Sequence, residues 1–204
     1  VVAPPIQAAE SAALGGVVFE GRFEQGPEGG GPRAFFVETA PDFRTYRVWV
    51  TGGDAESTHP IPGICDPVCD SPPWLEALPD GKAFVLLTDP DTLAVTVLFT
   101  DGTLAGTSTV HQGAGNFEGM VRVGRRVVFA LGELVSLVDY RVRLWSSAGE
   151  PAEQILDLTE FEPRPVLVEM VPGGDRAWLV ASTGADTRVF VTDGTSGGTL
   201  DLGG

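Results

Sequence analysis

The sequence predicts an all-β fold made of four tandem sheets, and three observations favour this fold class. Glycine and proline account for 27 and 16 of the 204 residues, and both residue types interrupt long helices. A pattern with a period of about 47 residues recurs four times along the chain. Within each copy, short apolar runs are separated by glycine-bearing turns, as in strands joined by hairpins.

Two independent ladders of equivalent residues define the repeat. The first follows the end of an apolar strand, with steps of 49, 47 and 45 residues, at Thr51, Thr100, Ser147 and Thr192. The second ladder consists of basic residues that each precede an apolar run. They recur with steps of 49, 44 and 50 residues, at Arg33, Lys82, Arg126 and Arg176. Together they divide the chain into one propeller-like domain of four repeats, at about 1–58, 59–107, 108–154 and 155–204.

Each repeat predicts four short strands, sixteen in all. The first strands are mildly apolar runs at 16–23, 74–78, 120–123 and 166–171. The second strands follow the basic ladder and are almost wholly apolar, which is typical of a strand covered on both faces. The third strands alternate polar and apolar residues and end at a hairpin glycine expected to have positive φ: Gly53, Gly102, Gly149 and Gly194. The fourth strands begin at Thr58, Thr107, Gln154 and Thr199.

A four-stranded antiparallel unit repeated at this period is typical of a β-propeller. One such sheet cannot cover its own two faces, so neighbouring sheets must stack around an axis. The four blades predicted here form either a whole ring or part of a larger one. If the ring does not close within this chain, its open face requires additional blades, a protein partner or an oligomer.

Two of the repeats carry a motif that points to a known family. Residues 100–107 read T-D-G-T-L-A-G-T, and residues 192–199 read T-D-G-T-S-G-G-T. They resemble the bacterial repeat E-L-W-x-x-D-G-T-x-x-G-T, whose proteins are propeller-like and exported. The first and third copies depart from the motif, and the leading glutamate is missing from all four. The resemblance implies fold and export but no activity. Asp101 and Asp193 are interpreted as turn-forming side chains that accept hydrogen bonds from nearby backbone amides.

Composition and cysteine usage restrict the partners and the compartment. The 28 acidic and 13 basic residues give a net charge of −15, which disfavours nucleic acid and anionic membranes as partners. No apolar run is long enough to cross a bilayer, so no membrane insertion is expected. Cys65 and Cys69 are the only cysteines, and we predict that they form a local disulfide. The predicted location is extracellular, periplasmic or at the cell surface. The alternatives are a metal held by these cysteines with His59 and Asp66 or Asp70, or two reduced, unpaired thiols.

Candidate ligand-binding residues lie on the loops that join second and third strands, because these loops share one face of a propeller. They are acidic, and we single out Asp42, Asp89, Asp91, Asp139 and Asp186 as candidates for a cationic partner or for Ca²⁺. The alternative is that an acidic protein simply carries carboxylates on its exposed loops. Because no loop has a dense cation-binding motif, no metal or other cofactor is predicted. The basic ladder either converges on an anion or pairs with local carboxylates such as Asp80 and Asp175.

Signals for catalysis are sparse. The two histidines, His59 and His111, do not occupy equivalent repeat positions, and the chain has no nucleophile elbow, phosphate loop or H-E-x-x-H motif. The sequence therefore favours an exported noncatalytic binding or scaffolding module within a larger protein assembly. The alternative is a carbohydrate-active hydrolase or lyase that uses carboxylates at the mouth of the propeller channel. Trp74 is either a sugar-stacking platform or a cap on the core between two blades.

Overall fold

The structure is a computed structural model that describes residues 33–41, 44–136, 139–161 and 164–203. It contains four antiparallel sheets in chain order and one short 3₁₀ helix, η1 (Leu158–Glu160), among these residues. The first sheet comprises β1 (Ala34–Thr39), β2 (Tyr46–Thr51) and β3 (His59–Pro60). The second comprises β4 (Trp74–Ala77), β5 (Ala83–Thr88), β6 (Ala94–Thr100) and β7 (Ser108–Ala114). The third comprises β8 (Asn116–Val123), β9 (Arg126–Ser136), β10 (Asp139–Ser147) and β11 (Glu153–Asp157), and the fourth β12 (Val166–Pro172), β13 (Ala177–Ser182), β14 (Thr187–Thr192) and β15 (Leu200–Asp201).

This arrangement confirms the predicted all-β propeller class. Strands within each sheet follow one another in chain order, with no crossover. The observed fourth strands begin within one residue of their predicted starts, at His59, Ser108, Glu153 and Leu200. The strand expected at 16–23 lies outside the described residues, so the first sheet has three described strands. Each observed sheet ends with its fourth strand, whereas the repeat limits drawn from the sequence fall where that strand begins.

The second strands of the two middle sheets, β5 and β9, are buried from both sides, as their apolar sequences predict. The prediction is wrong for β13 of the fourth sheet, where Trp178 is exposed because no described sheet packs on that side. In β5, Ala83 and Val85 pack in the core shared with the first sheet, while Phe84 and Leu86 pack in the core shared with the third. The same alternation holds in β9, where Val128 faces the fourth sheet. We call these two faces the preceding side and the following side of a sheet. Neighbouring sheets therefore shelter each other through alternate residues of one strand.

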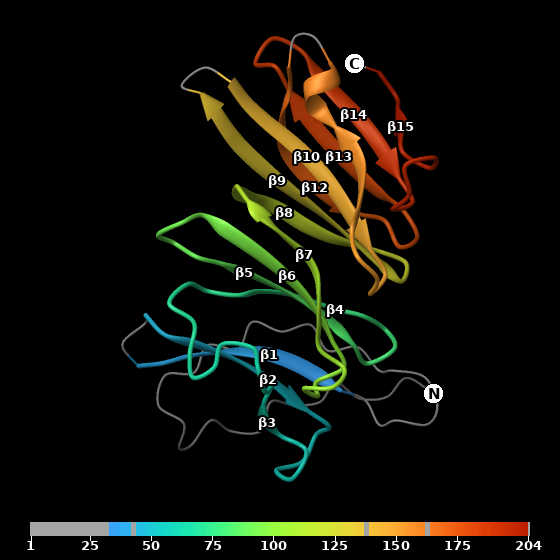
Figure 1. Cartoon of the computed structure of the whole chain (residues 1–204). Coiled ribbons are helices and arrows are strands. Elements are labelled where there is room, and N and C mark those ends of the chain that lie inside the picture. The colour runs from blue at the N-terminus through green and yellow to red at the C-terminus, as the bar shows by residue number, and fades with distance from the viewer. Residues whose placement is uncertain (1–32, 42–43, 137–138, 162–163, 204) are drawn as a thin grey trace.

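Three cores result, one between each pair of consecutive sheets. Their largest fully buried side chains include Phe35 in the first core, Phe84 and Phe129 in the second, and Phe190 in the third. No core cluster of the described residues joins the first sheet to the fourth. Figure 1 shows the consequence: the sheets stack as an open arc, with β1–β3 at one end and β12–β15 at the other.

The hairpins between third and fourth strands have the positive-φ glycine that the sequence predicts. Gly53, Gly102, Gly149 and Gly194 have φ of 100°, 90°, 118° and 85°. The last three also approach the preceding sheet closely. A Cβ on Gly102 would lie 2.9 Å from Val50, and one on Gly149 would lie 2.9 Å from Phe99. Glycine is therefore required in these hairpins both for backbone conformation and for contact between sheets.

The D-G-T motif forms a hydrogen-bond network that stabilises its hairpin. Asp101 Oδ1 accepts from the Thr103 backbone N–H (2.9 Å) and hydroxyl (2.7 Å), and the hydroxyls of Thr100 and Thr107 join the two strands at 2.7 Å. Asp193 and Thr195 repeat this arrangement at the same distances in the fourth sheet. The interpretation of both aspartates as turn-forming residues is confirmed.

Candidate functional site

One edge of the arc carries the loops between second and third strands, and we call it the loop edge. It consists of residues 40–45, 89–93, 137–138 and 183–186, of which 42–43 and 137–138 are not described. Asp42 therefore lies outside the described residues. Asp139 opens β10, where its backbone pairs with Ser136. The sequence-predicted candidates belong to different loops, one or two in each sheet.

Asp89, Asp91 and Asp186 are exposed and belong to local turns. Asp89 Oδ1 accepts from the backbone N–H groups of Asp91 (2.9 Å) and Thr92 (3.1 Å), and these bonds lower the pKa of Asp89 below its ordinary value of 3.8. The backbone of Asp186 closes its own turn with Thr183. Among the residues that the structure describes, no three His, Cys, Asp or Glu side chains gather into a group that could hold a metal ion. The loop edge is thus a set of separate anionic turns.

An aromatic pair lies beside these turns and joins two sheets. Trp74 opens β4 opposite Leu86, near the end of β5, and Phe117 is the second residue of β8. Their ring centroids lie 4.9 Å apart with the planes tilted by 54°, yet Trp74 remains 55% exposed. An exposed indole supported by a second ring offers an apolar and cation-attracting contact surface. Phe117 was not predicted, because nothing local in the sequence signals its contact with Trp74.

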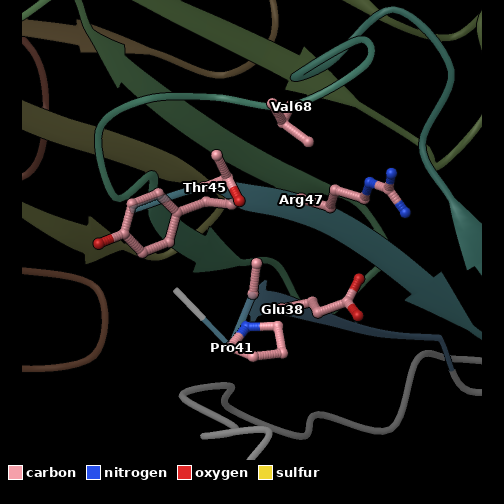
Figure 2. A pocket seen from close by; sticks show the side chains of 7 residues that line it. Glu38, Pro41, Thr45, Arg47 and Val68 are labelled. Carbon is pink, nitrogen blue, oxygen red and sulfur yellow. The ribbon is translucent and has the colours of Figure 1, made fainter. Parts of the chain in front are cut away.

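A shallow pocket opens at the loop edge of the first sheet. It has a volume of about 230 Å³ and is lined by Glu38, Ala40, Pro41, Thr45, Tyr46, Arg47 and Val68. Glu38 and Arg47 are cross-strand partners, and Figure 2 shows their charged ends extending in the same direction. Both charged groups already have partners, since Glu38 accepts from Trp49 Nε1 at 2.8 Å and Arg47 Nε donates to the Pro67 carbonyl at 3.2 Å. The hairpin register that pairs Glu38 with Arg47 is the signal that could have located this pocket.

Tyr140 and Glu118 meet on the third sheet, where the Tyr140 hydroxyl donates to the Glu118 carboxylate. Gly132 makes room for this contact, because a Cβ there would lie 2.0 Å from the Tyr140 hydroxyl oxygen. Burial and the Glu118 hydrogen bond raise the pKa of Tyr140 above its ordinary value of 10.0. A nucleophilic phenol requires the opposite shift, so this geometry stabilises a neutral tyrosine.

The side chains of the basic ladder form ion pairs with nearby carboxylates or, for Arg33, reach the hairpin of the following sheet. Lys82 lies 3.3 Å from Asp80, and Arg126 lies 3.4 Å from Glu150 and 3.2 Å from Glu153. Arg33 donates to the backbone carbonyl of Asp101, in the hairpin of the following sheet. The predicted pairing of the basic ladder with Asp80 is therefore observed at Lys82.

The cysteine prediction is confirmed: Cys65 and Cys69 form a disulfide with a Cα–Cα distance of 4.6 Å. Because both thiols are used, they supply no thiolate for the alternative metal site with His59. His111 packs against the rings of Phe129 and Trp145, with centroids 5.3 Å and 4.6 Å away, and burial lowers its pKa below 6.5. His111 is thus a neutral part of the second core.

Every described carboxylate with a resolved pKa shift is stabilised as an anion. Hydrogen bonds from Ser57 lower the pKa of Asp54, and those from Thr103 and Thr195 lower the pKa of Asp101 and Asp193. Burial opposes the shift at Asp157, but hydrogen bonds from Thr159 and Arg143 outweigh it and the pKa is lowered. A general acid at neutral pH needs a raised pKa, so these groups are suited to turns and ion pairs.

Comparisons with known proteins identify similar folds. Models of known families gave no match, and neither did the curated proteins. Among solved structures, the β-propeller domain of the Trilobed protease from Pyrococcus furiosus is similar with a TM-score of 0.47 and 10% identity, covering 91% of this chain and 70% of that one. An α-L-arabinofuranosidase from Fusarium graminearum is similar with a TM-score of 0.46 and 12% identity, covering 91% of this chain and 64% of that one.

A third similar structure is the subtype N11 neuraminidase-like protein of A/flat-faced bat/Peru/033/2010 (H18N11), with a TM-score of 0.47 and 12% identity. The match covers 91% of this chain and 52% of that protein. The match thus covers between 52% and 70% of the length of these structures. No helix among the described residues is both long and apolar enough to span a membrane.

Proposed function

We propose that this chain is an exported, noncatalytic binding module whose loop edge binds a basic segment of a partner protein. The observation that carries the proposal is the Trp74–Phe117 pair, an exposed indole held by a second ring among anionic turns. Tryptophan is enriched among the residues that dominate binding energy at protein interfaces. An indole face flanked by carboxylates attracts the guanidinium or ammonium group of a partner.

The charge of the molecule supports a basic partner. A net charge of −15 steers cationic segments toward the protein, and Asp89 and Asp91 place carboxylates on the same edge as Trp74. The lowered pKa of Asp89 keeps that carboxylate ionised well below neutral pH. The disulfide supports export to an oxidising compartment, where such a bond persists.

The proposal is tested with an arginine-rich nonapeptide as the probe, and binding is measured by isothermal titration calorimetry at low and physiological salt. We expect saturable binding that weakens as salt rises and that falls at least about tenfold in Trp74→Ala, which is roughly 1.4 kcal/mol. Asp91→Asn should weaken binding less, because it removes one rim charge. Binding that is insensitive to Trp74→Ala, or no binding at all, overturns the proposal.

The carbohydrate-active alternative is distinguished in a second arm of the same study. The wild-type chain and Glu118→Gln are incubated with a panel of chromogenic glycosides. The proposal expects no turnover above buffer. Turnover that Glu118→Gln abolishes would instead make the chain a glycosidase.

A further inference from the structure

Leu93 has a backbone conformation that a leucine side chain disfavours. It closes the loop between β5 and β6 on the loop edge, and its φ of 56° lies in the left-handed region. Leucine is disfavoured in this region because its Cβ crowds the following carbonyl oxygen, whereas glycine and, to a lesser degree, asparagine adopt it more readily. The backbone of this turn therefore favours a different residue from the one it has.

The turn itself makes no use of the Leu93 side chain. The Leu93 N–H donates to the Asp89 carbonyl at 2.9 Å, and the Leu93 carbonyl accepts from the Gly115 N–H at 3.0 Å. Both bonds use main-chain atoms that glycine or asparagine would supply equally well. The side chain is 49% exposed and belongs to none of the three core clusters. Neither the turn nor the described cores explain why leucine stands here.

The position of Leu93 links it to the aromatic pair of the loop edge. Gly115, which donates to Leu93, precedes Phe117 by two residues, and the ring of Phe117 supports Trp74. Trp74 pairs with Leu86 near the end of β5, where the loop of residues 89–93 begins. Trp74 and Leu93 are both exposed, so this end of the second sheet presents two large apolar side chains to solvent. Exposed apolar groups bordered by polar residues are typical of an interaction surface.

Carboxylates next to Leu93 determine which kind of partner fits. All five residues of the loop 89–93 are exposed, and two of them are Asp89 and Asp91. Within the described part of the chain, neither carboxylate forms an ion pair. Hydrogen bonds from the backbone of Thr92 and Asp91 lower the pKa of Asp89, so this group is charged at neutral pH. A basic segment that also carries an apolar side chain would complement both the charges and the leucine.

We propose that Leu93 determines the specificity of the loop edge, by contacting an apolar side chain that lies between the cationic residues of the partner segment. This inference rests on the proposed function, because it concerns the same edge and the same class of partner. Leu93 and Trp74 contact the apolar side chain, while Asp89 and Asp91 attract the cations that flank it. Strained backbone is often found where a side chain serves binding rather than folding.

Two peptides of equal charge test the contact by isothermal titration calorimetry. One is a nonapeptide of arginines with leucine at its centre, and the other has serine at that position. We expect the leucine peptide to bind the wild type about fivefold more tightly, for the partial burial of one leucine side chain. Leu93→Asn should abolish this preference and leave the affinity for the serine peptide within about twofold of the wild type. Leu104→Asn, which changes another exposed leucine in the hairpin between β6 and β7, is the matched control and should keep the preference.

Thermal unfolding separates a binding role for Leu93 from a structural one. Asparagine adopts the left-handed region more readily than leucine, so Leu93→Asn should have a Tm no more than about 2 °C below that of the wild type. A larger fall would show that the Leu93 side chain stabilises the fold, and this result would overturn the proposal.

The calorimetric outcomes distinguish this proposal from the one for the loop edge as a whole. If the serine peptide binds through Trp74 but the wild type does not prefer the leucine peptide, or if Leu93→Asn keeps the preference, only the role of Leu93 is overturned. If neither peptide binds, both proposals are overturned. Light scattering of the free chain tests a second copy as the occupant. A mass above 21.4 kDa that Leu93→Asn reduces to that of one chain would assign Leu93 to contact between copies and overturn its role in binding a basic segment.

Discussion

Phe84 and Trp178 occupy the same position of one repeat but lie in different surroundings. Phe84 is fully buried between the second and third sheets, with its ring 5.1 Å from that of Phe99. Trp178 lies on the outer face of the last described sheet and is 40% exposed. The repeat pattern therefore fixes which side a residue faces, whereas its energetic contribution depends on whether another sheet follows.

The hairpin glycines show the same contrast at the other end of the arc. Gly102 combines a positive φ with a close approach to Val50 of the preceding sheet, while Gly53 has the positive φ alone among described neighbours. The hairpin glycine at the end of the arc is thus required for its backbone conformation alone. The equivalent glycine inside the arc is required for its backbone conformation and for the close contact with the preceding sheet. Matched substitutions in these two pairs of positions separate the contribution of backbone conformation from that of packing.

The largest expected effect comes from truncating the two aromatic positions. Phe84→Ala should lower the free energy of unfolding by about 3–5 kcal/mol, because it removes a buried ring and leaves a cavity. Trp178→Ala should cost only about 1 kcal/mol at chain concentrations where no association occurs, since its site is already partly hydrated. Urea titrations of both variants measure the difference. Equal costs would show that the fourth sheet is covered in the free chain.

Adding a methyl group to the hairpin glycines gives the next largest effect. Gly102→Ala should destabilise the fold by about 2–4 kcal/mol, since backbone strain adds to the collision with Val50. Gly53→Ala should cost about 1 kcal/mol, for the strain alone. Thermal unfolding followed by circular dichroism would show the larger fall in Tm for Gly102→Ala. If both variants lose the same stability, the hairpin of the second sheet does not press on the first.

Smaller effects are expected from the turn carboxylates. Asp101→Asn should reduce the stability at pH 7 by about 1 kcal/mol, because hydrogen bonds from Thr103 favour the charged carboxylate. Asp91→Asn is the control. Its side chain is exposed, and it should stay within about 0.5 kcal/mol of the wild type.

The same carboxylates set the response to acid. Their pKa values in the folded chain are lowered from 3.8, so their stabilisation is present above that pH and is lost as the pH falls through the folded-state pKa. We expect wild-type stability to fall with acidification below about pH 4, with a shallower slope in Asp101→Asn. Urea midpoints measured from pH 6 to pH 2 test this. A steeper slope in the variant would mean that Asp101 is stabilised as the neutral acid.

The sequence was sufficient for the architecture because the repeat averages out local ambiguity. Four aligned copies located the hairpin glycines, the second strands and, to within one residue, the starts of the fourth strands. Periodicity could not assign the two faces of a second strand to particular neighbours. That assignment follows from the register and the stacking direction, and it explains why Phe84 and Trp178 differ.

The candidate site was less accessible to sequence reasoning. The loops that carry Asp89, Asp91 and Asp186 follow the second strands of their sheets, because antiparallel hairpins return such loops to one edge. The role of these residues in binding stays a prediction. Trp74 was singled out, but its partner Phe117 comes from another sheet and has no local signal. The Tyr140–Glu118 contact depends on the space beside Gly132, which only the folded backbone defines. Contacts between such side chains could therefore be identified only from the folded structure.

A double-mutant cycle between Gly102 and Val50 tests most directly whether each hairpin packs on the sheet before it. Unfolding free energies are measured for the wild type, Gly102→Ala, Val50→Ala and the double variant. We predict that the double variant is more stable than the sum of the single effects implies, by about 1 kcal/mol or more, because Val50→Ala removes the atoms that the new methyl group strikes. Effects that add to within about 0.5 kcal/mol would contradict the stacking of the first two sheets.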